Sequence, residues 1–427
     1  MDHKIKHLIN LYNKGSFNDL INEAKRFVKE DNKNFIIWNI LGAAYKILND
    51  LNHAHKAFEK SIEIEPKFSD PYNNLGIVFY EQGKLTKALE LFESAIKLKP
   101  DYVDVYSNMG LVLKDMSLFD KALKTLKKGL TFDNKNKQIF FNIGIVYQEI
   151  KDLENAEIFF NQAIELDPKN VDYIYRLSNL MLSTKRYDEA LILLKRIIQI
   201  GANTTNINKV NFWIKALEGK NAETAPIKHI QDIFDKYAKN FDESLVDDLQ
   251  YNVPKLIFDK LLEIKKDKNF GNVVDFGCGT GLVGEKIKDY CSLLIGVDIS
   301  KKMLFEAKKK NIYNKLLNID IITFLENEKL NYNLFIFADV FIYVGELNEI
   351  FQLIKSKNKI SGSLVFTIEL NENKDYFLEK SGRFSHSQKY IEKLASMNSF
   401  KISHFQQIKL RKEFEEFIKG ALVIIDF

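Results

Sequence analysis

The sequence predicts two parts of different fold class. We expect an all-α repeat array in the first half and an α/β domain with a mostly parallel, seven-stranded sheet in the second. The first half repeats its small and aromatic residues with a period of 34 residues. The second half alternates short apolar runs with helical segments, and a glycine-rich loop follows the first run. A length of 427 residues agrees with more than one domain.

Small residues carry the period of the first half. Glycines and alanines recur at steps of 34 residues, at Gly42, Gly76, Gly110 and Gly144, and at Ala54, Ala88, Ala122, Ala156 and Ala190. Prolines keep the same step at Pro66, Pro100 and Pro168. Small residues let two helices approach closely, and Pro ends the second helix of each pair.

This pattern resembles the tetratricopeptide repeat. One complete match is formed by Trp38, Leu41, Gly42, Tyr45, Ala54, Phe58 and Pro66. The resemblance implies a solenoid of about six helical hairpins over residues 1–204, with a concave face. We expect residues 205–218 to add a closing helix, because apolar residues have helical spacing at Ile207, Val210, Ile214 and Leu217.

Repeat arrays of this kind bind partners, so we expect a protein or peptide partner in the groove. Three asparagines fall at the same position of successive repeats, at Asn74, Asn108 and Asn142. In some tetratricopeptide families this position grips a peptide backbone, since a carboxamide both donates and accepts hydrogen bonds. The alternative is that asparagine is simply common at this position of the repeat.

Composition excludes several classes of function. The net charge is +4, from 62 Lys and Arg against 58 Asp and Glu, so a nucleic-acid partner is not expected. No apolar stretch approaches the length of a membrane-spanning helix. The only cysteines are Cys278 and Cys291, and the seven histidines lack metal-ligand spacing, so we expect no metal site. These features predict a soluble, cytoplasmic protein.

The pattern changes after residue 218. Residues 219–228 are polar and predict a linker, and residues 229–263 predict helices ahead of the next domain. Residues 264–427 contain seven apolar runs, at 272–276, 293–298, 315–319, 333–338, 364–369, 401–407 and 421–426. Strands that alternate with helices imply a mostly parallel sheet covered on both faces.

A glycine-rich loop follows the first of these runs, in the segment Val273-Val-Asp-Phe-Gly-Cys-Gly-Thr-Gly281. Glycines let the backbone turn sharply and approach a ligand, and the helix behind them presents free N–H groups. Acidic residues lie at the carboxyl ends of three successive runs: Asp275 is the last residue but one of the first, Asp298 ends the second, and Asp320 follows the third. Asp298 can accept both hydroxyls of a ribose, and Asp320 can accept from an exocyclic amine. The set therefore predicts a nucleotide-type ligand.

The loop and the three acids, in this order, resemble the class I S-adenosylmethionine-dependent methyltransferases. The resemblance implies a Rossmann-like fold with S-adenosylmethionine as cofactor. Asp275 would bind its ammonium group, Asp298 its ribose, and Asp320 would lie near its adenine. Further cofactor contacts are expected at Gly277, Cys278, Gly279, Gly281, Ile299, Ile321 and, on a lid helix, Tyr237. An NAD site and an empty sheet are the alternatives, and Tyr237 fits a helical core equally well.

More of the chain resembles one branch of this class, the bacterial predicted methyltransferases with tetratricopeptide repeats. The matching segments are FDKYAKNFD at 234–242, CGTGLVGE at 278–285, ADVFIYVGEL at 338–347 and GRFSHSQKY at 382–390. We expect the catalytic base at His386 and further catalytic residues at Asp339 and Tyr343. Arg383, Tyr390 and Arg411 are candidate substrate contacts. Alternatively, His386 and Arg383 pin a loop, and Asp339 caps the next helix.

The leading prediction is methyl transfer from S-adenosylmethionine to an acceptor, with the solenoid holding a protein or a carrier-bound substrate. The sequence does not identify the acceptor. One alternative is a scaffold whose C-terminal domain only senses the cofactor. Another is a transferase that uses S-adenosylmethionine to transfer a different group, such as an aminopropyl group.

Overall fold

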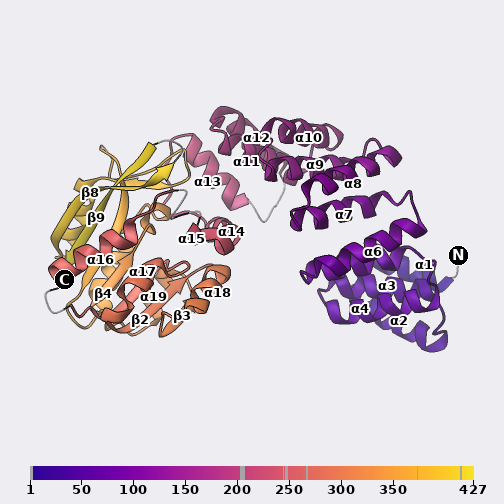
Figure 1. The fold of residues 1–427 in the computed structure, drawn as a ribbon, viewed down its shortest axis with the longest axis horizontal. Coiled ribbons are helices and arrows are strands. Elements are labelled where there is room, and N and C mark those ends of the chain that lie inside the picture. The colour runs from indigo at the N-terminus through magenta and orange to yellow at the C-terminus, as the bar shows by residue number, and fades with distance from the viewer. Residues whose placement is uncertain are drawn as a thin grey trace. The chain divides into compact units, whose positions relative to one another are not determined.

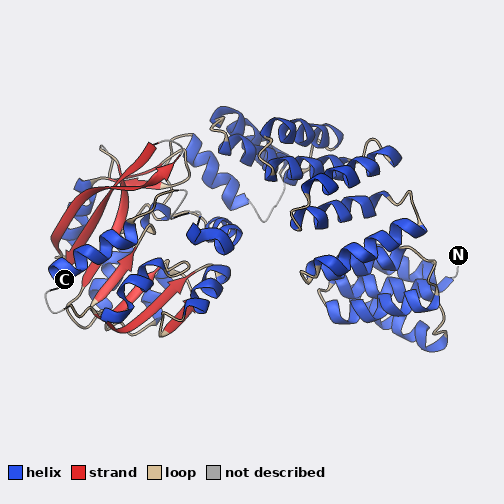
Figure 2. Ribbon diagram, viewed as in Figure 1, coloured by secondary structure: helices blue, strands red, loops and turns tan. Residues whose placement is uncertain are grey.

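The chain forms two compact units, Met1–Thr184 and Lys185–Phe427. The computed structural model describes residues 3–201, 207–243, 245, 249–265, 268–372, 374–413 and 416–427. The first unit is built from helices, and the second combines helices with a sheet (Figure 2). The predicted junction between 1–204 and 205–218 falls within residues 202–206, which lie outside the described residues.

The helices of the first unit follow the 34-residue frames of the sequence (Figure 1). Each frame from 1–34 to 137–170 holds two helices, and the next frame begins with one more. Their bounds are α1(His3–Asn13), α2(Phe17–Glu30), α3(Phe35–Ile47), α4(Leu51–Ile64), α5(Asp70–Glu81), α6(Leu85–Leu98), α7(Val103–Asp115), α8(Phe119–Phe132), α9(Lys137–Glu149), α10(Leu153–Leu166) and α11(Val171–Ser183). The predicted repeat solenoid is confirmed at the level of its fold.

The repeat glycines are sites of close helix packing. A Cβ atom at Gly76 would lie 2.6 Å from the ring of Phe92, and one at Gly144 would lie 2.6 Å from the ring of Phe160. Neither glycine has a left-handed backbone. The left-handed conformation occurs instead in the turns within the hairpins. The residues concerned are again 34 apart: Gly15, Asn49, Gly83, Ser117 and Lys151.

The second unit contains a nine-stranded sheet within its described residues. The strands are β1(Gly271–Phe276), β2(Cys291–Asp298), β3(Lys315–Asn318), β4(Leu334–Phe337), β5(Ser363–Leu370), β6(Tyr376–Leu378), β7(Phe384–His386), β8(Lys401–Glu413) and β9(Glu416–Asp426). All seven predicted runs form strands. The two additional strands, β6 and β7, are each three residues long. Strands this short leave too little alternation in the sequence to be predicted.

Five of the strand pairs are parallel and three are antiparallel, so the mostly parallel sheet is confirmed. The order along the sheet is β3-β2-β1-β4-β5-β9-β8, and the β8–β9 pair forms one edge (Figure 1). β4 pairs with β5 only as far as Phe366, whereas β7 pairs with Glu369 and Leu370 farther along β5. Since β9 occupies the other edge of β5, β7 lies beyond the carboxyl end of β4.

Helices cover both faces of the sheet. The helices in the described residues of the second unit are α12(Tyr187–Ile200), α13(Ile207–Leu217), α14(Ile227–Tyr237), η1(Ala238–Asn240), α15(Phe241–Glu243), α16(Val253–Ile264), α17(Leu282–Ile287), η3(Lys288–Tyr290), α18(Lys301–Lys310), α19(Ile321–Asn327), η4(Phe341–Tyr343), α20(Asn348–Lys357) and α21(Gln388–Met397). Side chains of α19, α20 and α21 pack on one face, and those of α16 and α17 on the other. No helix in the described ranges has both the length and the apolar character needed to cross a bilayer.

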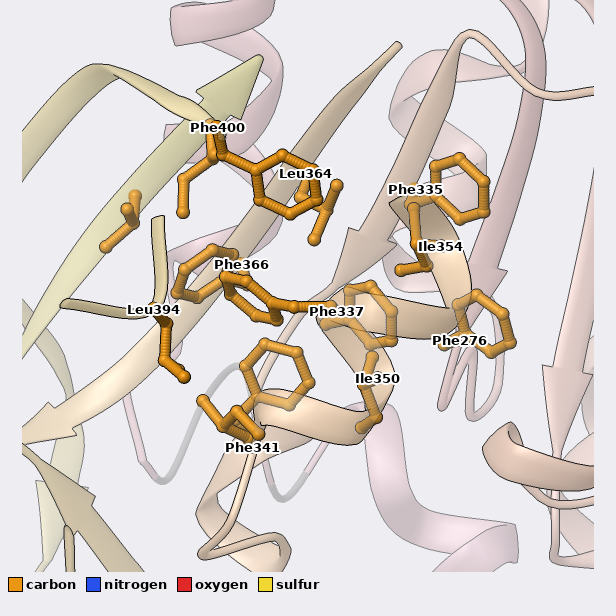
Figure 3. Packing of buried hydrophobic residues seen from close by; sticks show 14 of the residues in the cluster. Phe276, Phe335, Phe337, Phe341, Ile350, Ile354, Leu364, Phe366, Leu394 and Phe400 are labelled. Atoms are coloured by element: carbon orange, nitrogen blue, oxygen red, sulfur yellow. The ribbon is translucent and has the colours of Figure 1, made fainter. Parts of the chain in front are cut away.

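An aromatic stack fixes the strand ends that carry the candidate site. Phe276 ends β1 and stacks on Phe337, which ends β4, with ring centroids 4.8 Å apart. Phe337 in turn stacks on Phe341 at 4.7 Å (Figure 3). All three rings are fully buried. The glycine loop after Phe276 and Asp339 after Phe337 therefore leave the sheet from rigid, adjacent positions.

Residues 219–228, predicted as a linker, lie against the β6–β7 hairpin and the segment after β4. The Asn221 Nδ2 group donates to the Tyr376 carbonyl at 3.0 Å, and the Leu378 amide donates to Asn221 Oδ1 at 3.0 Å. The Ala225 amide donates to the Tyr343 carbonyl at 2.9 Å. The polar composition of this segment thus supplies hydrogen bonds to the α/β region.

Candidate functional site

A cavity of about 500 Å³ lies at the carboxyl ends of the parallel strands in the second unit. Its floor is the loop after β1 together with the ends of β2 and β4, and its cover comes from α14–α16. Most of the lining is apolar, and the charged side chains in it are Asp275, Asp298, Asp339, Arg383 and Arg411. In open α/β sheets, ligands bind at this edge of the strands.

The glycine loop leaves space for a ligand against its backbone. Gly277 and Gly279 are left-handed, with φ of 61° and 54°. A Cβ at Gly277 would lie 2.5 Å from Val340, whereas the nearest atom to a Cβ at Gly279 is in Phe241, at 3.8 Å. Gly277 is therefore required by the turn and by packing, and Gly279 opens onto the cavity.

Asp298 presents a carboxylate to the cavity at the end of β2. Its Oδ2 atom accepts from the Gly279 amide at 2.9 Å, and its Oδ1 atom accepts from the Ser300 amide at 2.7 Å. Burial raises the pKa of Asp298 to about 6. Each oxygen keeps a lone pair for a further donor, and Ile299, Ile319 and Ile321 supply apolar surface in the same lining.

Asp275 is the most deeply buried acid of the cavity, with 1% of its surface exposed. The Tyr313 hydroxyl donates to its Oδ2 atom at 2.7 Å. Burial raises the pKa of Asp275 to about 7, although this hydrogen bond opposes the shift and the charge of Asp298 adds to it. A cationic ligand group near Asp275 would favour the ionised form.

Asp339 is held in a strained conformation beyond β4. Its φ is 55°, in the left-handed region that costs a non-glycine residue free energy. Its amide donates to Thr367 Oγ1, and the Thr367 hydroxyl donates to Asp339 Oδ1, both at 2.9 Å. Arg411 Nη1 donates to Asp339 Oδ2 at 2.7 Å. Strain that is fixed by this many contacts is typical of functional positions.

Helices α14 and α15 are fastened over the strand ends by polar contacts. The Gln231 Nε2 group donates to the Ile299 carbonyl at 3.2 Å, and the Ser300 hydroxyl donates to Asp235 Oδ1 at 2.5 Å. The Asp242 carboxylate accepts from Thr280 of the glycine loop and, at 2.5 Å, from Lys310 of α18. These contacts make the two helices a lid over the cavity.

Comparison with known families agrees with this geometry. A family model described as a methyltransferase domain matches residues 273–356, which contain the glycine loop, Asp298 and Asp339. Models of the tetratricopeptide repeat match residues 36–68, 57–90, 78–117 and 149–210. The chain is a tetratricopeptide-repeat protein with a methyltransferase domain.

The curated relatives match the chain over shorter spans. An uncharacterized methyltransferase of Schizosaccharomyces pombe is 28% identical over 124 residues, which are 27% of this chain and 39% of that protein. An uncharacterized methyltransferase of Bacillus cytotoxicus is 33% identical over 79 residues, 18% of this chain and 37% of that protein. The chain thus spans less than two fifths of the length of these relatives.

Solved structures of repeat proteins are also similar to part of the chain. The crystal structure of MamA is 25% identical and covers 40% of this chain and 99% of its own, with a TM-score of 0.35. A thermophilic TPR protein of Thermus thermophilus is 22% identical and covers 42% of this chain and 97% of its own, with a TM-score of 0.38.

Most of the predicted cofactor contacts meet in the cavity of the methyltransferase domain. They are Tyr237, Asp275, Gly277, Cys278, Gly279, Asp298, Ile299 and Ile321. Gly281 lies outside the lining and caps α17. Asp320 also lies outside it, because its carboxylate caps α19 and accepts from the Thr323 amide at 3.0 Å and hydroxyl at 2.6 Å. An acid after a strand also suits the start of the next helix, so no contact of Asp320 supports its predicted place near the adenine, which stays a prediction.

His386 and Tyr390 are buried in the methyltransferase domain outside the cavity lining. His386 Nε2 lies 3.0 Å from the Gly345 carbonyl, and its ring stacks on Tyr390. Burial lowers the pKa of His386 to about 4. The Tyr390 hydroxyl donates to Glu346 at 2.9 Å and accepts from the Leu347 amide. These positions contradict the predicted roles of His386 as base and of Tyr390 as substrate contact, and they agree with the alternative that the motif pins a loop.

The other candidates of the methyltransferase domain do line the cavity: Asp339, Tyr343, Arg383 and Arg411. The Tyr343 ring meets Phe234 of the lid edge to face, with centroids 5.7 Å apart. Sequence reasoning missed Tyr313, Asp235, Asp242 and Glu369. Asp235 and Asp242 lie within the FDKYAKNFD segment, so their recurrence in a family motif was a signal that they have a role.

The repeat asparagines bond to neighbouring repeats. Asn74 Nδ2 donates to Asn39 at 3.0 Å, and Asn108 Nδ2 donates to Asn73 at 2.9 Å. Asn142 is 1% exposed and donates to the Ser107 hydroxyl at 2.8 Å. The structure therefore contradicts a peptide contact by Asn142, whose carboxamide is used between helices. Asn74 and Asn108 are half-buried.

Proposed function

We propose that the methyltransferase domain binds S-adenosylmethionine in this cavity and transfers its methyl group to an acceptor beside Asp339. The Asp298 carboxylate carries the proposal, because it is buried at the end of β2, is fixed to the glycine loop and keeps lone pairs for a ligand. A pair of ribose hydroxyls suits such an acceptor. The isoleucines in the same lining suit the flat apolar faces of an adenine.

The residues present fit this cofactor. Gly279 leaves its backbone open to the cavity, and Asp275 offers a buried carboxylate to an ammonium group. When bound, S-adenosylmethionine supplies an activated methyl group on a positively charged sulfur. The raised pKa of Asp275 supports this match, because a nearby cation compensates the cost of ionising a buried acid.

The chain's own residues would align the reactants and exclude water. Phe234, Tyr237 and Phe241 line the cavity from the lid, which the contacts of Asp235 and Asp242 hold in place. Asp339 is fixed on the opposite wall, where its carboxylate can accept a hydrogen bond or a proton from an acceptor.

Calorimetric titration with S-adenosylhomocysteine tests the cofactor site. We expect micromolar binding with one site per chain, and no binding by Gly279→Val, because its side chain would enter the ligand space. Gly83→Val is the matched control, since Gly83 is also left-handed with nothing within 4 Å of its Cβ position, but lies in a repeat turn. A wild-type protein that does not bind S-adenosylhomocysteine would contradict the proposal.

A substitution of Asp339 tests whether the domain catalyses methyl transfer or only senses the cofactor. A domain that only senses the cofactor needs no strained acid on the wall away from Asp298. We expect labelled S-adenosylmethionine to transfer its methyl group to a component of a cell extract, and Asp339→Asn to abolish transfer while it preserves S-adenosylhomocysteine binding. Full transfer by this variant would remove Asp339 from the mechanism.

We also propose that the repeat unit binds a protein partner through the helices that carry Asn74 and Asn108. Both carboxamides are half-buried, and each retains hydrogen-bonding capacity beyond its bond to the preceding repeat. The Asn74→Ala, Asn108→Ala double variant should lose a partner that cross-links to the wild type. Retention of every cross-linked partner would contradict this role.

A further inference from the structure

Five charged side chains form one connected cluster at the β4 end of the cavity. Arg411 Nη1 donates to Asp339 at 2.7 Å, and Arg411 Nη2 donates to Glu369 at 2.6 Å. Arg383 Nε donates to the same oxygen of Glu369 at 2.8 Å, and Arg383 Nη2 donates to Glu413. The side chains of Arg411 and Glu369 are each more than nine-tenths buried.

The two arginines face the cavity, and two of the carboxylates lie behind them. Arg383, Arg411 and Asp339 line the cavity, whereas Glu369 and Glu413 do not. Burying a guanidinium is costly unless it is paired, and Glu369 and Glu413 provide this pairing from outside the lining. The arrangement therefore keeps two cations at the wall of an otherwise mostly apolar cavity.

Arg383 retains unused donors. In the part of the chain that the structure describes, its Nε and Nη2 atoms have partners, but its Nη1 atom has none. A guanidinium edge with free N–H groups binds a carboxylate through two parallel hydrogen bonds. The cluster has two positive and three negative groups, so a second negative charge on the ligand adds repulsion, and a doubly charged phosphate fits less well than a monoanion.

The location of the arginines separates them from the cofactor contacts. β2 and β4 flank β1 on opposite sides, so Asp298 and Asp339 follow strands about 10 Å apart. Arg383 immediately precedes β7, which lies beyond the end of β4. The arginines thus lie on the acceptor side of the cavity, next to Asp339 and across β1 from Asp298.

We infer that Arg383 and Arg411 bind the carboxylate of the methyl acceptor, a small carboxylic acid with an apolar body whose reacting atom lies beside Asp339. The inference rests on the proposed function. The apolar body would pack on lining residues near the cluster, among them Ile342, Tyr343 and Val344.

Matched acids and amides test this inference. Benzoate, phenylacetate and 3-phenylpropanoate, with their primary amides, are titrated into the full chain with and without saturating S-adenosylhomocysteine. We expect at least one acid to bind ten-fold or more tightly than its amide. Arg383→Gln should abolish this preference, Arg383→Lys should retain part of it, and both should bind S-adenosylhomocysteine like the wild type. Lys393→Gln, which removes an exposed cation paired with Asp375, is the control.

Four outcomes would overturn the inference. The amides bind as well as the acids, no acid binds at all, or the preference for the acid survives in Arg383→Gln. In the fourth, Arg383→Gln weakens the binding of S-adenosylhomocysteine ten-fold or more, which would mean that the arginines bind the carboxylate of the cofactor. The wild-type comparison needs no variant to fold. Failure of S-adenosylhomocysteine to bind the wild type would instead overturn the proposed function, and the titrations without it would still decide on the carboxylate site.

Discussion

The repeat unit and the methyltransferase domain use the same small residue for opposite purposes. Gly76 and Gly144 leave no room for a Cβ, because an aromatic ring fills the space 2.6 Å away. Gly279 leaves room, because the nearest atom lies 3.8 Å from its Cβ position. Where other side chains of the protein fill the space at the Cβ position, the glycine stabilises the fold. Where that space is open, a ligand can approach the backbone of the glycine.

Polar side chains show the same contrast. In the repeats, Asn108 and Asn142 bond to side chains of the preceding repeat. In the methyltransferase domain, burial raises the pKa values of Asp275 and Asp298. Both carboxylates also keep lone pairs that can accept further hydrogen bonds. Binding sites are therefore recognised by polar groups whose burial is not compensated within the chain.

The largest expected effect concerns this uncompensated burial. The pKa of Asp275 is raised from 3.8 to about 7, so its contribution to folding is fully present below pH 4 and is lost as the pH rises through 7. Tyr313 and Asp298 are the titratable groups that act on it most strongly. Asp275→Asn should therefore stabilise the ligand-free protein at pH 8 by on the order of 2 kcal/mol while weakening S-adenosylhomocysteine binding.

Urea unfolding at pH 4 and pH 8 checks this prediction. From pH 4 to pH 8, the wild type should lose stability relative to Asp275→Asn. Binding of S-adenosylhomocysteine should restore the stability of the wild type at pH 8. If the two proteins differ in free energy of unfolding by the same amount at both pH values, burial does not make the ionisation of Asp275 costly.

The glycine contrast is tested by one substitution in each unit. Gly76→Ala should destabilise the repeats by about 1–3 kcal/mol, because its methyl group overlaps the Phe92 ring, and should leave S-adenosylhomocysteine affinity unchanged. Gly279→Ala should weaken that affinity at least ten-fold with a smaller loss of stability. Unfolding measures the stability of both variants, and calorimetry measures their affinity for S-adenosylhomocysteine. A loss of affinity in Gly76→Ala together with a larger loss of stability in Gly279→Ala would contradict the comparison.

The asparagine ladder, formed by Asn74, Asn108 and Asn142 of successive repeats, gives a smaller effect. Asn142→Ala removes a buried hydrogen bond and leaves Ser107 without that donor, so it should cost about 1–2 kcal/mol. Asn74→Ala removes a half-buried bond and should cost less. Thermal unfolding distinguishes the two. Equal losses would mean that burial does not decide the strength of the ladder.

The smallest effect is expected at the lid. Asp235→Asn weakens the contact with Ser300 and should raise the dissociation rate of S-adenosylhomocysteine a few-fold, with little change in unfolding. Stopped-flow displacement measures the rate, and Lys228→Gln, which removes an exposed cation from the same helix, is the control. An unchanged rate would show that Asp235 does not hold the lid.

The sequence predicted the features that depend on local pattern. The 34-residue period located the repeat helices, and the order of strand, glycine loop and acid located Asp275 and Asp298. It was wrong for His386, which pins a loop, and it left out the cap that Asp320 forms on α19, because one local pattern can serve two purposes. It also missed contacts between distant segments.

Those missed contacts depend on tertiary packing. Asp235 meets Ser300, and Glu369 meets both arginines, across many intervening residues. No spacing rule along the chain encodes such pairs, because the path of the backbone between them decides which residues meet.

The most direct test of the cofactor site compares Asp298, which ends β2, with Asp320, which caps the helix after β3. S-adenosylhomocysteine is titrated calorimetrically into the wild type, Asp298→Asn and Asp320→Asn. Since a hydrogen bond to a charged group contributes roughly 1.5–3 kcal/mol, Asp298→Asn should weaken binding ten-fold or more, whereas Asp320→Asn should change it less than about two-fold. Unchanged affinity in Asp298→Asn, or an equal loss in Asp320→Asn, would contradict the assignment of the site.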